Sequence, residues 1–133
     1  MILEKKIKTA LLCISSRFIT HLSKADWGYS IWIMEKKGRA FARAYIYSDD
    51  DKTIYLDNLS VSWYARKEGL GTKLQEIREW IGSYVGFKES CLWVVKGTWQ
   101  KEWYERRGYI EHQDHPEEKN GVWMIKSLNN KTE

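Results

Sequence analysis

Hydrophobic and polar positions along the middle of the chain follow the patterns of β-strands. Residues 29–34 and 39–47 are rich in aromatic and β-branched side chains, and the polar segment 35–38 separates them, as in a β-hairpin. A polar turn over residues 48–52 precedes a third run, residues 53–61, which predicts another strand. The aspartates of that turn are consecutive, so we interpret them as a solvated loop and expect no metal site.

Beyond residue 72 the apolar spacing changes to that of a helix. Leu74, Ile77 and Ile81 recur on one face, which predicts a surface helix that packs on a sheet and ends at Gly86. The other predicted elements are a helix over residues 5–16, a helix or strand over 18–23, a strand over 90–95, a helix from its N-cap Thr98 to Arg107, and strands over 109–113 and 122–128 joined by a polar turn around His115 and Pro116. This order of elements indicates a mixed sheet covered by helices.

Composition limits the class of protein. The 133 residues, of which 43% are apolar, predict one globular domain over residues 1–133. No apolar run approaches the roughly 20 residues of a membrane span, and the charged start of the chain, residues 1–8, is unlike a secretory signal. We therefore expect a cytoplasmic protein with no membrane partner. Two isolated cysteines, Cys13 and Cys91, are interpreted as small core residues.

The segment from Arg66 to Thr72 lies between a predicted strand and a predicted helix. Two of its residues, Gly69 and Gly71, allow a tight turn and a close approach of the backbone to a ligand. Backbone amides at the N-terminus of a helix carry partial positive charge and bind phosphate oxygens. The sequence therefore predicts an anion-binding loop, and the net charge of +4 is compatible with an anionic ligand.

Three segments together carry a family resemblance. The run from Arg66 to Gly71 matches a diphosphate motif of Arg or Gln, two residues, Gly, one residue and Gly or Ala. Residues 56–61 are similar to the strand that precedes that motif, and residues 103–109 are similar to a Phe-Tyr-Glu-Lys-x-Gly-Phe segment that follows it. In this combination the chain resembles the GNAT superfamily of acyl-CoA-dependent N-acetyltransferases.

The resemblance implies an α/β (α+β) fold whose mixed, mostly antiparallel central sheet splays between its fourth and fifth strands and is flanked by helices. Only 28 residues precede the predicted strand at Tyr29. The family usually places a strand and two helices there, so we expect a shortened N-terminal part and an open acceptor side. A peptide acceptor, or a homodimer that completes the site, would suit such an opening.

The resemblance also implies acetyl-CoA as co-substrate and no metal. The pyrophosphate would lie on the loop and helix amides, and the pantetheine arm would pair with the exposed edge of the fourth strand. The backbone amide of Val61 would hold the oxyanion that forms when an amine attacks the thioester. The implied coenzyme-binding residues are Leu59, Ser60, Val61, Arg66, Lys67, Glu68, Gly69, Leu70, Gly71 and Thr72.

Two side chains are candidate catalysts. Tyr104 aligns with the family tyrosine that protonates the departing thiolate, and a phenol, with a reference pKa near 10, keeps its proton at neutral pH. The alternative for Tyr104 is a helix residue that only packs its ring. Asp57 is the candidate base, because period-two counting places it on the same strand face as Leu59 and Val61. The alternative for Asp57 is a strand carboxylate that pairs with a basic neighbour.

The main prediction is direct transfer of an acetyl group from acetyl-CoA to a primary amine of a small molecule, peptide or protein. Gly97 and Gln100 replace an asparagine and an alanine of the family, which suits a catalytically inactive acyl-CoA-binding or regulatory protein instead. Eight tryptophans and eight tyrosines suit a nucleic-acid-binding module. Several of them, Trp99 included, occupy positions suited to burial, and no RNA-binding signature is present, so we do not expect a nucleic-acid partner.

Overall fold

Seven strands form one sheet among the residues that the computed structural model describes, 2–115 and 119–128. The strand order is β1-β2-β3-β4-β5-β7-β6, and neighbouring strands are antiparallel except for the parallel pair β4 and β5. In chain order the elements are α1 (Ile2–Leu12), β1 (Phe18–Ala25), β2 (Gly28–Glu35), β3 (Ala40–Tyr47), β4 (Thr53–Val61), a 3₁₀ helix (Trp63–Glu68), α2 (Leu70–Val85), β5 (Glu89–Val95), α3 (Trp99–Glu105), β6 (Ile110–Glu111) and β7 (Gly121–Ser127). The predicted mixed, mostly antiparallel sheet with flanking helices is confirmed.

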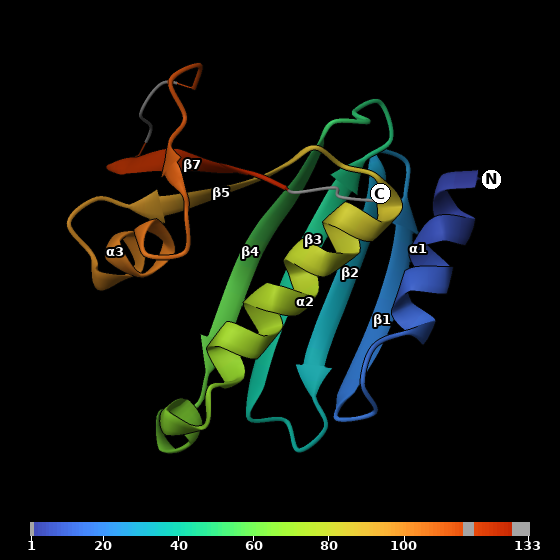
Figure 1. The fold of residues 1–133 in the computed structure, drawn as a ribbon, viewed down its shortest axis with the longest axis horizontal. Coiled ribbons are helices and arrows are strands. Elements are labelled where there is room, and N and C mark those ends of the chain that lie inside the picture. The colour runs from blue at the N-terminus through green and yellow to red at the C-terminus, as the bar shows by residue number, and fades with distance from the viewer. Residues whose placement is uncertain (1, 116–118, 129–133) are drawn as a thin grey trace.

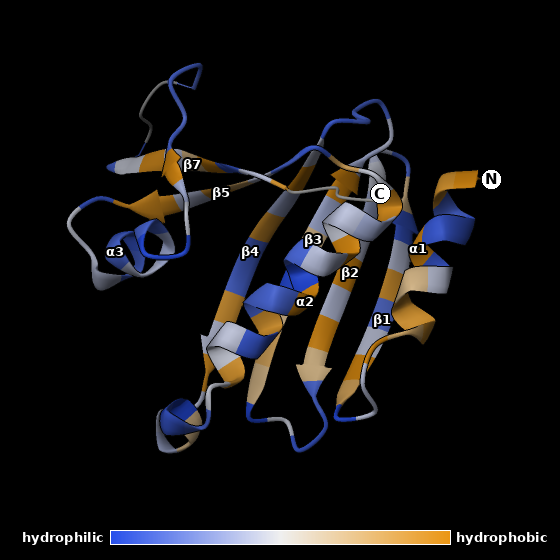
Figure 2. Cartoon of the chain, in the orientation of Figure 1, coloured by the Kyte–Doolittle hydropathy of each residue, from blue (hydrophilic) through white to orange (hydrophobic). Residues whose placement is uncertain are grey.

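Helices α1 and α2 lie side by side over one face of the sheet (Figure 1). The apolar side of α2, with Leu74 and Ile81 fully buried, packs on alternate residues of the strands. Figure 2 shows hydrophobic stretches on the strands that α2 crosses and mostly hydrophilic residues in the loops. The buried strand residues of this core include Ile31, Ile33, Ala42, Ala44, Ile46, Ile54 and Leu56. The alternation and helical spacing of the sequence therefore describe the core correctly.

The N-terminal part contains one helix and one strand before β2. Segment 18–23, which the sequence left open between helix and strand, belongs to β1, and only Asp26 and Trp27 connect β1 to β2. Because α1 ends at Leu12, Cys13 lies exposed in the turn that follows, so its predicted burial is wrong.

The C-terminal elements differ from the prediction in detail. Thr98 occupies the predicted N-cap position of α3, but its hydroxyl donates a hydrogen bond to the carbonyl oxygen of Val95 (2.7 Å) and forms no capping hydrogen bond with the helix. Trp99, the first residue of α3, is 65% exposed, so its predicted burial is wrong. Pro116 of the predicted turn lies outside the described residues. No helix in the described ranges is long and apolar enough to cross a membrane.

A β-bulge in β4 changes the direction of its side chains. Arg43 pairs with Asp57, but Phe41 pairs with Ser60, so β4 has one extra residue between these pairs, and Asn58 has a φ of +54°. Directly paired residues project on the same side of a sheet. Val61 pairs with buried Ala40 and therefore faces α2, whereas Asp57 faces the opposite side with Arg43. The predicted shared face of Asp57, Leu59 and Val61 is wrong, because the bulge breaks the period of two.

Strands β4 and β5 separate beyond the middle of their lengths. Their pairing runs from Thr53 with Glu89 to Leu56 with Leu92 and then stops, although β4 continues to Val61. The predicted splay between the fourth and fifth strands is confirmed.

Candidate active site

A pocket of about 680 Å³ occupies the gap between the diverging ends of β4 and β5. Trp103 and Tyr104 of α3 line it on the face that α2 covers, and Tyr104 contacts Arg78 of that helix. Asp57 and Trp93 line it from the opposite face, where their strand partners project. The pocket therefore passes through the plane of the sheet.

The predicted anion-binding loop forms one wall of this pocket. The 3₁₀ helix leads into Gly69, whose φ of +74° is in the left-handed region, and α2 begins at the next residue. A Cβ built on Gly71 would lie 3.6 Å from Cγ2 of Val61, so the loop packs directly on the end of β4. No described side chain caps the start of α2, which leaves its first amides available to a ligand.

The predicted coenzyme-binding residues divide into two groups. Those that line the pocket are Leu59, Ser60, Val61, Arg66, Gly69, Gly71 and Thr72. Leu70 is buried in the core instead, and Lys67 and Glu68 are exposed outside the pocket lining. A role for these three residues would therefore rest on their backbone.

The edge of β4 that faces the gap has no strand partner beyond Leu56. The amide of Ser62 donates to the carbonyl oxygen of Arg39 (2.7 Å), which points Ser62 toward β3. Successive residues of a strand direct their amides to opposite sides, so the amide of Val61 points away from β3 and toward the gap. The carbonyl oxygen of Val61 accepts from Nε of Arg66 (3.4 Å), consistent with this orientation.

Arg107 joins α3 to the start of α2. Its guanidinium donates to Oγ1 of Thr72 (2.9 Å) and to the carbonyl oxygen of Trp103 (3.0 Å), and its Cζ lies 3.4 Å from the centre of the Trp103 ring. Burial lowers the pKa of Arg107, yet a guanidinium keeps its charge at neutral pH. This cation adds to the positive end of α2. Arg107 was not predicted from the sequence, although it lies inside the matched segment 103–109.

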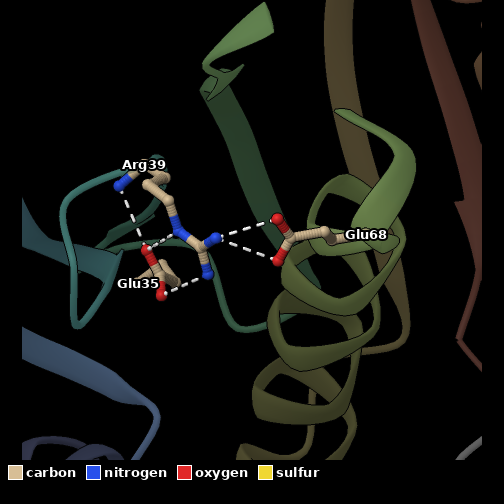
Figure 3. Close-up of polar contacts among 3 residues, drawn as sticks. All are labelled: Glu35, Arg39 and Glu68. Atoms are coloured by element: carbon tan, nitrogen blue, oxygen red, sulfur yellow. Dashed lines mark hydrogen bonds and ion pairs between the residues drawn. The ribbon is translucent and has the colours of Figure 1, made fainter. Parts of the chain in front are cut away.

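An ion-pair network ties the β2–β3 hairpin to the anion-binding loop (Figure 3). Arg39 donates to both carboxylate oxygens of Glu68 (2.9 Å each) and to both of Glu35 (3.1 and 3.0 Å). Glu68 directly precedes Gly69, and Arg39 balances the negative charge that it brings near an anion site. Hydrogen bonds from Arg39 lower the pKa of Glu35 from its ordinary 4.5 to about 2.

We expect Glu35→Gln to make the stability of the protein less dependent on pH. A carboxylate with a depressed pKa in the folded state stabilises it above the unfolded pKa, and that contribution is lost as the pH falls through the folded pKa. The variant should therefore be less stable than wild type at pH 7, and the difference should shrink from pH 4.5 toward pH 2. Urea unfolding at several pH values measures this. Glu76→Gln, which changes an exposed carboxylate of α2, is the control, and a pH-independent difference for Glu35→Gln would contradict the prediction.

Asp57 is the one carboxylate among the described residues that line the pocket. Its two oxygens accept hydrogen bonds from Nε (2.8 Å) and Nη2 (2.6 Å) of Arg43, and its side chain is 35% exposed. This contact matches the pairing with a basic neighbour that the sequence offered as the alternative. Its role as a base stays a prediction.

Tyr104 is buried against the wall of the pocket. Its ring contacts those of Trp103 (centroids 4.9 Å apart) and Tyr109 (5.5 Å), and its hydroxyl oxygen accepts a hydrogen bond from Nη2 of Arg78 (3.3 Å). A guanidinium has no acceptor, so this bond leaves the hydroxyl hydrogen of Tyr104 free to be donated.

Arg78 is a second residue near the site that the sequence did not predict. It lies four residues after Leu74 and three before Ile81, so the helical period places it within the buried stripe of α2. Its charge hid it, because arginine is almost never fully buried without a partner. The conflict between an apolar position and a charged residue was the available signal.

Neither a protein-family model nor a curated protein matches the sequence. Solved structures do match the fold. A GNAT family acetyltransferase from Elizabethkingia anophelis with acetyl-CoA bound aligns with a TM-score of 0.62 and 13% identity, over 86% of this chain and 100% of that chain. The chain has the GNAT fold.

Two further solved structures align with the chain to a similar degree. An acetyltransferase from Streptococcus agalactiae aligns with a TM-score of 0.62 and 20% identity, over 76% of this chain and 67% of that chain. N-acetylglutamate synthase from Neisseria gonorrhoeae, complexed with coenzyme A and N-acetyl-glutamate, aligns with a TM-score of 0.62 and 16% identity, over 75% of this chain and 26% of that chain. The fold that the three sequence segments implied is therefore present.

Proposed function

We propose that this chain is an acyl-CoA-dependent N-acetyltransferase, with residues 1–133 acting as one domain, that moves an acetyl group from acetyl-CoA directly to a primary amine. The observation that carries the proposal is the pocket through the sheet, which connects the anion-binding loop to the free edge of β4 and to Tyr104. The acetyl-CoA and coenzyme A bound to two of the matched structures support the choice of co-substrate.

The residues of the pocket suit each part of coenzyme A. The amides after Gly69, with Arg107 nearby, offer positive charge to the pyrophosphate without the need for a metal. The edge of β4 from Leu59 to Val61 offers unpaired backbone groups to the amides of the pantetheine arm. This arrangement would place the thioester in the gap between the strands.

The chemistry that follows uses three groups of the chain. The amine attacks the thioester carbon, and the amide of Val61 stabilises the oxyanion. Tyr104 donates its proton to the sulfur as the carbon–sulfur bond breaks. Asp57, on the far side of the gap, takes the proton that the attacking nitrogen loses. The acceptor would therefore approach from the face that carries Asp57.

Direct transfer is favoured over a covalent acyl-enzyme. Burial raises the pKa of the Cys91 thiol to about 12, so it is protonated at neutral pH and is a poor nucleophile. Neither Cys91 nor Cys13 lines the pocket. Kinetics should accordingly proceed through a complex of both substrates rather than by a ping-pong route.

The proposed acceptor side of the site is aromatic. On the sheet face of Asp57, the rings of Tyr45, Tyr55 and Tyr47 contact one another, and Trp27 at their edge is 43% exposed. The two-residue link between β1 and β2 adds no helix on this side. We propose a primary amine on a small molecule, peptide or protein as the acceptor, a homodimer as the assembly that could complete the site, and the cytoplasm as the location.

An acyl-CoA-binding protein without turnover is the second candidate. It is favoured by Gln100, which lines the pocket where the family has an alanine, and by Gly97, whose φ of +74° shapes the entry to α3. Both functions require coenzyme binding, and only the enzyme requires release of free thiol.

A thermal-shift screen with acetyl-CoA, longer acyl-CoAs and coenzyme A tests the binding step. A ligand at about 100 times its Kd stabilises the folded state by about 2.7 kcal/mol, which is readily seen as a rise in Tm. Release of free thiol across a panel of amines then tests turnover. The absence of a shift with every coenzyme A species would overturn the proposal, and a shift without thiol release would favour the binding protein.

We expect Asp57→Asn to lower kcat/KM about tenfold to a hundredfold, because water in this half-exposed position can replace part of a general base. Arg43→Met distinguishes the role of Asp57 as a base from its role in the ion pair. This variant removes the ion-pair partner but leaves the carboxylate of Asp57, so it should keep most of the activity. The measurement is initial-rate thiol release. Equal losses in both variants would show that the ion pair, not the base, matters.

A further inference from the structure

Arg78 lies in the middle of α2 and is fully buried. Its Nη1 donates to the carbonyl oxygens of Arg43 (3.0 Å) and Asp57 (2.9 Å), beside the bulge where the β3–β4 pairing is interrupted. Its Nη2 donates to Oε1 of Gln75 and to the hydroxyl oxygen of Tyr104 (3.3 Å). One guanidinium thus contacts both the backbone of β4 and the proposed acid.

The positive charge of Arg78 is not matched by an adjacent anion. Among residues 2–115 and 119–128, no carboxylate forms an ion pair with it, and its Nε is buried without a hydrogen-bond partner. The carboxylate of Glu79 is linked to Arg78 only through Gln75, and Asp57 offers Arg78 its backbone carbonyl oxygen while its carboxylate binds Arg43. A buried charge without a counter-ion is costly, and such charges gather at functional sites.

The hydrogen bond to Tyr104 has a direction. Arg78 can only donate, so it occupies a lone pair of the phenol oxygen and orients the hydroxyl hydrogen away from α2. Tyr104 lines the pocket, so that hydrogen can reach a group bound there. A donor with full positive charge also stabilises negative charge that develops on the phenol oxygen.

We infer that Arg78 is a positioning residue for acetyl transfer, which acts through Tyr104 and rests on the proposed function. When the carbon–sulfur bond breaks, its electron pair goes to sulfur, and sulfur takes the proton of Tyr104. The new carbon–nitrogen bond holds the acetyl group, and the proton of the amine goes to the base. The phenolate of Tyr104 is then held by Arg78 until solvent returns its proton.

The test is a double-mutant cycle with Arg78→Gln and Tyr104→Phe, singly and together, measured as kcat for thiol release and Kd for coenzyme A. Arg78→Gln should lower kcat about 10- to 100-fold, the effect of losing a charged hydrogen bond, with Kd within about threefold of wild type. Added to Tyr104→Phe, it should lower kcat by less than about threefold, because its target is already absent.

Tyr109→Phe is the matched control. The hydroxyl of Tyr109 belongs to the same buried network, through Gln75 (2.9 Å), Ser90 (2.8 Å) and Glu79 (2.9 Å), but it forms no hydrogen bond to the hydroxyl of Tyr104. Its loss should lower stability and leave kcat within about threefold of wild type. If Arg78→Gln does not fold, Arg78→Lys, which keeps the charge, replaces it in the same cycle.

Each outcome decides the inference. If Arg78→Gln lowers kcat by the same factor in the wild-type protein and in Tyr104→Phe, the role of Arg78 is only structural and the inference is overturned. A rise in Kd for coenzyme A with unchanged kcat would also overturn it. If the wild-type protein releases no thiol with any amine, the proposed function and this inference both fail. If the wild-type protein turns over but Arg78→Gln lowers kcat equally with and without Tyr104→Phe, only the inference fails.

Discussion

Tyr104→Phe lowers kcat about 10²- to 10⁴-fold and leaves the affinity for coenzyme A close to wild type, the expected result for removal of a general acid. The substitution removes one oxygen and keeps the ring, which packs between Trp103 and Tyr109. The fold and the pocket lining should therefore persist. The proton for the leaving thiolate then has to come from water, which is less well placed.

Thiol release and calorimetric binding of coenzyme A measure the two effects separately. Tyr64→Phe is the matched control, because Tyr64 is an exposed phenol in the 3₁₀ helix and lies outside the pocket lining. It should behave as wild type in both assays. An unchanged kcat in Tyr104→Phe would show that Tyr104 only packs its ring, which was the alternative interpretation from the sequence.

Gly28→Ala should lower the free energy of unfolding by about 4 kcal/mol or more, at the extreme of single substitutions. Gly28 begins β2 directly after the two-residue link from β1, with a φ of +154°. A Cβ at this position would lie 1.9 Å from the carbonyl oxygen of Ile46. That atom belongs to the backbone of the central strand β3, so the clash cannot be relieved by a side-chain rotation.

Urea unfolding followed by circular dichroism measures the loss, and Gly38→Ala is its control. Gly38 also has a positive φ, of +78°, but a Cβ there would meet no atom within 4 Å. Gly38→Ala should therefore cost only about 1 kcal/mol of backbone strain. If the two variants were destabilised equally, strain rather than the collision would explain both.

Local patterns predicted most of the elements. The alternating residues of β2, β3 and β4 and the spacing of Leu74, Ile77 and Ile81 predicted strands and a helix that the structure contains. The region before Tyr29 was harder, because β1 is an edge strand whose last three residues are all exposed, so its period is weakly marked. Segment 18–23 could be assigned to a strand only from the pairing of β1 with β2.

The candidate site was predicted less evenly. The loop from Arg66 to Thr72 was found because its glycines and its position before a helix are local features. The face of Asp57 was predicted wrongly, because the extra residue at Asn58 leaves no mark in the hydrophobic pattern. Arg78 was overlooked for a different reason: composition alone assigns an arginine to the surface.

By itself, the sequence determined the order of strands and helices from Tyr29 onward and the position of the anion-binding loop, because these depend on neighbouring residues and on their period along the backbone. The tertiary structure alone decided which side chains meet. Arg78 contacts Tyr104 across 26 positions of the chain, and Arg39 contacts Glu68 across 29. Such contacts depend on how α2 and α3 pack against the sheet and on where its strands part, and these are properties of the whole fold rather than of any segment.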